Sequence, residues 1–331
     1  MIKAAIIGLG EIGCVHIEAI KNISSAEITA GSDLIPERKV VLPENATFFS
    51  DYHLIPEIKP DVVHICLPHY LHFPVAKFYA ESGINIFTEK PLAMNAVEGE
   101  EYAKLEIQFG VKICLCFQNR LNTTSEVLFT LLRSGEYGAV KGVRGYVAWH
   151  RDKAYYAQGP WRGLIAQAGG GCMINQAIHT IDLMQYFAGS PVVSVKGFCG
   201  QMLDLGVEVE DTASGRIVFK NNVEGLFTAS ITNYTDEEVE IAVYCEKSNF
   251  LINNKKLYRI HNGEREILAE DSATFSGKAV YGDSHTALIA RFYRALEMNS
   301  NDYIHPEEGI PSLKIIDAIR ESSKTGKTIQ F

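Results

Sequence analysis

Short apolar runs alternate with helical patterns over the first third of the chain. The apolar runs have the length of buried strands and cover residues 2–7, 26–30, 61–67, 84–88 and 111–116. Helical patterns separate them at residues 14–20, 70–82 and 95–109. Strands that are separated by helices predict an α/β Rossmann domain with a doubly wound parallel sheet, which we expect over residues 1–120.

The pattern changes in the remainder of the chain. Helices are expected at 123–134, from the glycine triplet 169–171 to about 189, and at 285–298 and 309–324. Between residues 192 and 268 the chain reads as successive strands, and paired Asn or Asn-Gly residues mark the turns. Residues 121–331 therefore predict an α+β domain with a large, mostly antiparallel open sheet for substrate binding and oligomerisation, whose last helix packs back on the first domain.

Composition and charge narrow the functional classes. The 331 residues are 47% hydrophobic and 21% charged, as in soluble globular proteins, and the formal net charge of −9 disfavours nucleic acid as a partner. The sequence has neither a signal-peptide pattern nor an apolar run of the ~20 residues needed to span a membrane. Its seven cysteines are scattered, so we expect reduced thiols and a cytoplasmic protein.

A glycine-rich turn follows the first apolar run and indicates a dinucleotide site. Gly8 permits the tight turn, Gly10 lets a pyrophosphate approach the backbone, and Gly13 lets the following helix pack on the strand. The backbone N–H groups of Glu11 and Ile12 open that helix, where unpaired donors and the helix dipole favour phosphate.

Asp33 ends the second apolar run, twenty residues after the last glycine of the turn. A carboxylate at this place accepts hydrogen bonds from the adenosine ribose and repels a 2′-phosphate. Leu34 and Ile35 follow where a phosphate binder would need a cation, although Arg38 is near. We therefore expect NAD as the cofactor, in preference to NADP.

Ligands of doubly wound sheets bind beyond the carboxyl ends of the strands. We expect the cofactor to contact further residues that follow two of these strands: Leu67, His69, His72, Glu89 and Lys90. A lysine between a strand end and Pro91 is well placed to polarise a substrate hydroxyl and to stabilise a developing oxyanion, so Lys90 is a candidate catalytic residue.

Asn175, His179 and Asp182 follow the glycine triplet at helical spacing and share one face. A polar stripe is costly to bury for packing alone, which favours a catalytic or substrate-binding role for His179 over a core histidine. Asn175 and Asp182 are candidate substrate contacts, and Asp182 suits an orienting role. The three side chains do not form a strong zinc set, and His64, His69 and His72 lie on different elements, so we expect no required metal.

The loop 150–163 carries Tyr155, Tyr156, Trp161 and Arg162. Aromatic faces suit the apolar faces of sugars, and a guanidinium suits a carboxylate or phosphate, so Tyr156, Trp161 and Arg162 are candidate substrate contacts. The alternative is that Trp161 and Arg162 hold the two domains together.

With these residues assembled, the sequence resembles the glucose-fructose oxidoreductase, inositol dehydrogenase and MocA (Gfo/Idh/MocA) family of NAD(P)-dependent oxidoreductases. The resemblance covers almost the whole chain. Its markers are the segments 8–13, 89–91, 161–163 and 169–171, followed by Asn175, His179 and Asp182.

The resemblance implies hydride exchange between nicotinamide and a secondary alcohol of a sugar, cyclitol or sugar nucleotide, by a homodimer or homotetramer assembled through the open sheet. In such an enzyme Lys90 contacts the reacting hydroxyl and His179 is the acid/base. Inositol dehydrogenases carry aspartate where this chain has Asn175, which argues against inositol as the substrate.

Two alternatives stay open at this point. A retained-cofactor enzyme of the same family would oxidise its substrate transiently, as glycosidase-like or lyase-like members do. A regulatory protein would bind NAD(H) without turnover, although an acid/base pair would then have no use.

Overall fold

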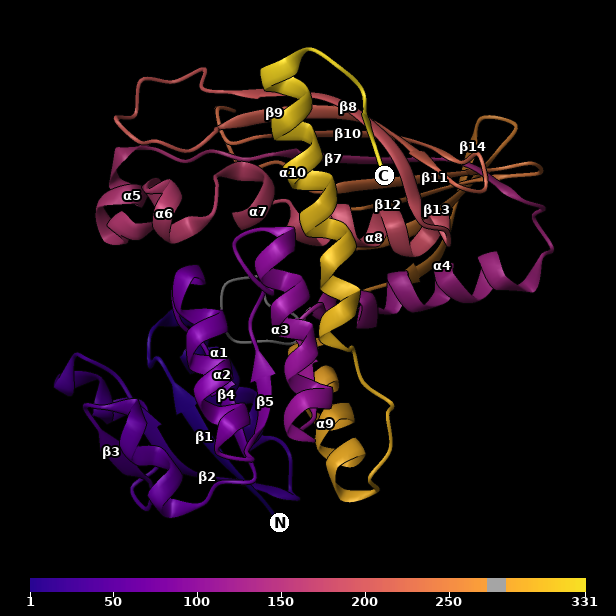
Figure 1. Ribbon diagram of the computed structural model, residues 1–331. Helices are drawn as coiled ribbons and strands as arrows, with labels where there is room; N and C mark the ends of the chain where they lie inside the picture. Colours follow the sequence, from indigo (N-terminus) through magenta and orange to yellow (C-terminus); the bar gives the residue numbers. More distant parts are fainter. Residues whose placement is uncertain (273–283) are drawn as a thin grey trace. The chain divides into compact units, whose positions relative to one another are not determined.

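The computed structural model describes residues 1–272 and 284–331, which group into two compact units (Figure 1). The first unit holds residues 1–93, 97–118 and 284–309. The second holds residues 94–96, 119–272 and 310–331. Residues late in the chain therefore complete the first unit.

A parallel sheet with strand order β3-β2-β1-β4-β5-β6 forms the centre of the first unit. Its strands are β1 (Ile2–Ile7), β2 (Ala26–Ser32), β3 (Thr47–Phe49), β4 (Val62–Ile65), β5 (Asn85–Thr88) and β6 (Ile113–Leu115). This is the strand order of dinucleotide-binding sheets, in which the order reverses between β1 and β4. The predicted Rossmann sheet is confirmed.

Helices flank this sheet because burying their apolar faces against it removes apolar surface from water. They are α1 (Glu11–Lys21), α2 (His72–Glu81), α3 (Ala96–Phe109) and α9 (Ser284–Glu297). Ile17 and Ile20 of α1 and Val75 and Tyr79 of α2 are buried, at spacings of three and four residues. The short 3-10 turns of the chain are η1 (Pro36–Val41), η2 (Tyr52–Ile58), η3 (His69–Leu71), η4 (Gln118–Leu121), η5 (Pro160–Gly163) and η6 (Pro306–Gly309).

A broad sheet with order β14-β13-β12-β11-β7-β10-β9-β8-β15 dominates the second unit. Its strands are β7 (Val140–Ala148), β8 (Val192–Gly200), β9 (Thr212–Phe219), β10 (Glu224–Ser230), β11 (Glu240–Cys245), β12 (Asn249–Asn253), β13 (Lys256–His261), β14 (Glu264–Glu270) and β15 (Ile329–Gln330). Among the described pairings of this sheet only β7 with β10 is parallel, so the prediction of a mostly antiparallel sheet is confirmed. Asn254 and Asn262 adopt positive φ at two of the predicted hairpin turns.

Helices cover one face of the second sheet. They are α4 (Thr123–Ser134), α5 (Lys153–Gln158), α6 (Ile165–Ala168), α7 (Cys172–Asn175), α8 (Ile178–Ala188) and α10 (Ile310–Thr325). Figure 1 shows α4 to α8 on the same side of the strands, and Ile319 of α10 lies against Gly197 of β8 and Gly215 of β9. Helix α8 packs on β7, where a Cβ at Gly145 would lie only 2.6 Å from Met184 Sδ. The absence of a side chain at Gly145 thus sets how closely α8 approaches the sheet.

The opposite face of this sheet carries mixed side chains. Phe198 and Leu226 are about half exposed there, at 57% and 52%. An ion pair joins Arg144 to Glu240 on neighbouring strands. Within the described residues, no helix combines the length and apolar character needed to cross a membrane.

Candidate active site

The glycine turn between β1 and α1 has the geometry that a dinucleotide requires. Gly8 has φ +94, and a Cβ there would collide with the Cys66 carbonyl oxygen. A Cβ at Gly13 would collide with the carbonyl oxygen of Gly8, so strand and helix touch at this point. At Gly10 the nearest atom to such a Cβ is Arg38 Nη1, at 3.8 Å, which leaves room for a ligand beside the backbone.

Asp33 follows β2 and lies against the same turn. Its Oδ2 accepts hydrogen bonds from the Leu9 backbone N–H at 2.8 Å and from Arg38 Nη1 at 3.0 Å, and its Oδ1 accepts from the Ile35 N–H at 2.9 Å. The carboxylate side chain is only 7% exposed, whereas that of Arg38 is 43% exposed. A carboxylate and a guanidinium therefore flank the place where a ribose is expected.

His72 joins two segments that follow the strands of the first sheet. The ring is fully buried, with Nδ1 2.7 Å from the Pro91 carbonyl oxygen and Nε2 2.8 Å from that of Leu67. The sequence predicted direct cofactor contact, and the geometry adds a role in fixing the backbone around Lys90. His69 is buried in η3, directly before α2.

Glu89 points into the first unit. Its Oε1 lies 3.0 Å from His16 Nε2 and 3.6 Å from His285 Nε2, and its Oε2 accepts from the Lys90 backbone N–H at 3.2 Å. Glu89 is 5% exposed and His16 is fully buried. Burial opposes the charge of Glu89, but the hydrogen bond from His16 and the nearby His285 imidazole outweigh it and keep the pKa of the carboxyl well below its usual range.

In the second unit, Asn175 ends α7 and His179 is the second residue of α8. The predicted continuous helix is thus interrupted at Gln176 and Ala177. The Tyr155 hydroxyl accepts hydrogen bonds from Asn175 Nδ2 at 3.2 Å and Gln176 Nε2 at 3.1 Å, which links the aromatic loop to this polar stretch.

Asp182 is held by an arginine that the sequence analysis missed. Its two carboxylate oxygens accept from Nε and Nη2 of Arg120, at 2.9 and 2.6 Å, in a bidentate pair. The side chains of Asp182 and Arg120 are 2% and 10% exposed. This pair holds the Asp182 carboxylate in place, and no periodicity in the sequence indicated its partner.

Arg162 lies between two aromatic rings of its own loop. Its guanidinium carbon is 4.9 Å from the centre of the Tyr155 ring and 5.4 Å from that of Trp161. Tyr156 is buried in the same unit, with 8% of its surface exposed.

Burial raises the pKa of the Cys172 thiol well above its usual value, which leaves it a poor nucleophile.

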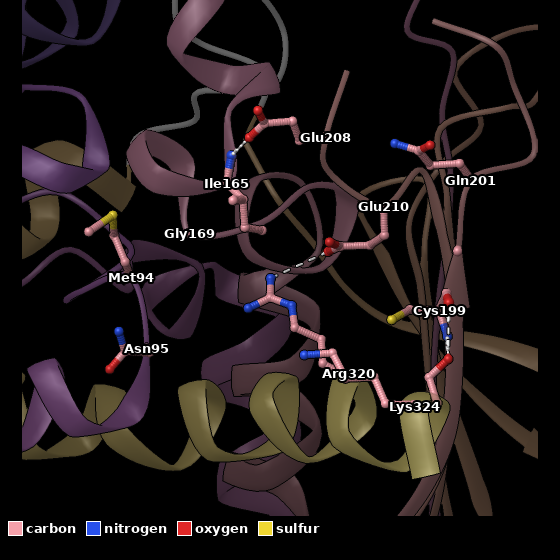
Figure 2. A pocket seen from close by; sticks show the side chains of 12 residues that line it. Met94, Asn95, Ile165, Gly169, Cys199, Gln201, Glu208, Glu210, Arg320 and Lys324 are labelled. Atoms are coloured by element: carbon pink, nitrogen blue, oxygen red, sulfur yellow. Dashed lines mark hydrogen bonds and ion pairs between the residues drawn. The ribbon is translucent and has the colours of Figure 1, made fainter. Parts of the chain in front are cut away.

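A cavity of about 660 Å³ lies in the second unit near the end of α10 (Figure 2). Arg320 faces Glu210 across it, with Nη2 3.6 Å from the carboxylate, while Glu208 accepts from the Ile165 backbone N–H at 2.9 Å. Its described lining contains none of the predicted site residues. The sequence indicates this cavity only weakly, because its one local signal is that Arg320 and Lys324 lie one helical turn apart.

Comparison with known proteins decides the family. The family model of the oxidoreductase family with an NAD-binding Rossmann fold matches residues 2–116 of the sequence. The family model of the GFO/IDH/MocA C-terminal domain matches residues 127–250. The chain belongs to the Gfo/Idh/MocA family. It is thus an NAD-binding oxidoreductase of the dehydrogenase class, as the motifs predicted.

Two curated relatives and one solved structure match this oxidoreductase along nearly their whole lengths. An uncharacterized oxidoreductase of Bacillus subtilis, YrbE, is 25% identical over 100% of this chain and 96% of its own. The D-glucoside 3-dehydrogenase of Escherichia coli is 23% identical over 100% of this chain and 97% of its own. The WlbA dehydrogenase of Bordetella pertussis, whose structure was solved with NADH and UDP-GlcNAcA, is 25% identical to this chain. The two structures match with a TM-score of 0.88 over 100% of this chain and 97% of the WlbA chain.

Proposed function

We propose that this Gfo/Idh/MocA protein oxidises a secondary alcohol of a sugar or sugar nucleotide, or reduces the matching ketone, with NAD(H) as the hydride carrier. Lys90 polarises the alcohol oxygen and His179 takes its proton. The hydride passes to the nicotinamide, so two electrons and one proton leave the substrate carbon together, while the hydroxyl proton goes to the imidazole.

The observation that carries the proposal is the setting of Lys90. The residue directly follows Glu89 at the carboxyl end of β5, and the buried Glu89 carboxylate accepts from the Lys90 backbone N–H. His72 fixes the Pro91 carbonyl oxygen on the other side. A lysine whose backbone is held on both sides is pre-organised to present its ammonium group at the edge where ligands of such sheets bind.

The substrate class follows from the second unit. Asn175 and Tyr155 form a neutral hydrogen-bonding pair, which suits hydroxyl groups, and no carboxylate occupies position 175. Relatives named as a glucoside dehydrogenase and a dehydrogenase solved with a sugar nucleotide support the same class. We therefore place sugars and sugar nucleotides before inositol.

The test is reduction of NAD, followed by absorbance, across aldoses, uronic acids, cyclitols and UDP-sugars, with NADP in parallel. Once a substrate is found, Lys90→Ala is expected to lower kcat by about 10²- to 10⁴-fold, in the range of general acid–base groups, while NADH binding measured by fluorescence changes little. His179→Ala is expected to act similarly and to remove one limb of the pH profile of kcat/KM.

Matched controls are the surface lysine Lys77 and the exposed His261, each changed to Ala, which should leave kcat unchanged. Full activity of Lys90→Ala would refute the assignment. If no compound of the panel is turned over although NADH still binds, the two alternatives can be told apart. Co-purification of NAD(H) would favour an enzyme with a retained cofactor, and a partner that binds only one redox form would favour an NAD(H)-binding regulator.

We further propose that the exposed face of the second sheet forms the contact between subunits of a homodimer or homotetramer. Phe198, Leu226 and Tyr244 expose 57%, 52% and 37% of their surfaces on the strands of this sheet. Arg144 and Glu240 contribute a charged pair among them. Apolar side chains rimmed by polar ones are typical of protein interfaces.

A further inference from the structure

Four metal-ligating side chains converge inside the first unit. They come from separate segments of the chain: His16 from α1, Glu89 from the end of β5, Cys116 from the end of β6, and His285 from the start of α9. One donor atom of each lies within 4.8 Å of the corresponding atoms of the other three. All four residues are buried, with at most 5% of any one exposed.

We propose that these four residues form a binding site for a zinc-class divalent metal ion. Two imidazoles, a thiolate and a carboxylate are a complete tetrahedral ligand set for zinc. The set leaves no position for substrate, so the proposed site is structural. It shares Glu89 with the proposed setting of Lys90 but does not require that lysine to be catalytic, and it departs from our sequence-based expectation that no metal is required.

The distances fit a site that contracts modestly around an ion. His16 Nε2 and His285 Nε2 lie 3.0 and 3.6 Å from Glu89 Oε1. Bonds of about 2.0–2.3 Å to zinc place tetrahedral donors roughly 3.3–3.8 Å apart. Since all donors of this cluster lie within 4.8 Å of one another, no pair must close by more than about 1–1.5 Å. A side-chain rotation can supply that movement without a change of backbone.

Charge also favours a divalent ion. A buried carboxylate is costly unless a positive charge compensates it. With the thiol of Cys116 deprotonated, its negative charge and that of Glu89 balance the two charges of the ion, and the proton released on binding passes to solvent. The result is a neutral cluster in a dry interior.

His16 has a hydrogen-bond partner for its second ring nitrogen, as a metal-bound histidine requires, and here that partner is another histidine. His16 Nδ1 lies 2.8 Å from His64 Nδ1, and His64 Nε2 lies 2.7 Å from the Tyr293 hydroxyl. With the metal on Nε2, His16 donates its Nδ1 proton to His64, which then donates to Tyr293. Without metal the chain runs the opposite way, from Tyr293 through both rings to Glu89.

The experiment measures metal content of the full-length protein. Protein from zinc-supplemented cells, dialysed against metal-free buffer, is expected to hold about one zinc per chain by mass spectrometry. Protein from cobalt-supplemented cells is expected to show tetrahedral cobalt absorption and a thiolate-to-cobalt charge-transfer band. Less than about a tenth of an equivalent of either metal, with no thiolate band, would overturn the proposal and leave a hydrogen-bonded cluster.

Paired variants locate the ion. Cys116→Ser and His285→Ala should each lose most of the bound metal, whereas Cys114→Ser, which removes an equally buried thiol two residues away, should keep it. A second group, Glu106, His305 and Glu307, is more exposed, so His305→Ala is the control for adventitious binding. Loss of metal in His305→Ala but not in Cys116→Ser would overturn the proposal. If Cys116→Ser does not fold, the thiolate–cobalt band of the wild-type protein still decides.

Discussion

Replacement of Asp33 by Asn tests how the first unit selects its cofactor. The amide keeps the shape of the side chain and one acceptor for the Leu9 N–H, but it removes the charge that faces Arg38 at 3.0 Å. We expect NAD to bind more weakly and NADP more tightly, because Arg38 becomes available to a 2′-phosphate. The change isolates one charge, since the rest of the glycine turn is untouched.

The structure allows the size of this switch to be worked out. A hydrogen bond to a charged acceptor contributes ~1.5–3 kcal/mol and a neutral one ~1, so NAD should lose about 0.5–2 kcal/mol, or roughly 2- to 30-fold in Kd. Two unit charges 4 Å apart near a protein surface interact by about 4 kcal/mol, which we halve for the solvent around the partly exposed Arg38. Together the two effects amount to about 2.5–4 kcal/mol, so the NADP-to-NAD preference should rise roughly 70- to 900-fold.

Fluorescence titration with NADH and NADPH measures both dissociation constants without a known substrate. Asp51→Asn is the matched control, because Asp51 caps η2 in the same unit and lies far along the chain from the turn. A preference that stays within about threefold of the wild type would refute the reasoning. Equal weakening of both cofactors would show damage to the turn, which is also against it.

Three further changes test other parts of the structure. Arg120→Met should lower the free energy of unfolding by about 3–5 kcal/mol in a urea titration, since it leaves the buried Asp182 carboxylate unpaired; adding Asp182→Asn to the same chain removes that charge and should recover part of the loss. Burial lowers the pKa of His305, but the hydrogen bond and charge of Glu106 outweigh burial and raise that pKa. The pair therefore adds to the free energy of unfolding at pH values below the unfolded pKa of the histidine, and this contribution is lost as the pH rises through the folded pKa. Glu106→Gln should abolish this pH dependence of the free energy of unfolding. Leu226→Arg should shift the molar mass in light scattering toward the monomer, and an unchanged mass would contradict assembly through the exposed sheet face.

The alternation of strand and helix in the first 120 residues was enough to predict a parallel sheet and five of its six strands, because each apolar run and each glycine is a local signal. The three-residue strand β3 was not predicted. Hairpins at Asn254 and Asn262 were predicted for the same reason, since positive φ selects asparagine and glycine. The two sheets could therefore be predicted before any contact was known.

Features that depend on distant contacts could not be predicted in this way. The pairing of Arg120 with Asp182 joins residues 62 apart, and the Glu89–His285 contact spans most of the chain. Neither pair belongs to a periodic sequence pattern that would indicate which residue contacts which. The break between α7 and α8 was also missed, because the apolar spacing on its two sides continues in phase.

Gly145 has a consequence for engineering this enzyme. It lies on the face of β7 that α8 covers, and even an alanine there would press on Thr180 and Met184, in the helix that carries His179. Screens for altered specificity that score only turnover would record such a change as catalytic, although it touches no reacting group. A library directed at this helix should hold position 145 constant, and inactive clones with substitutions on β7 should be sorted by their melting temperature before any chemical role is assigned.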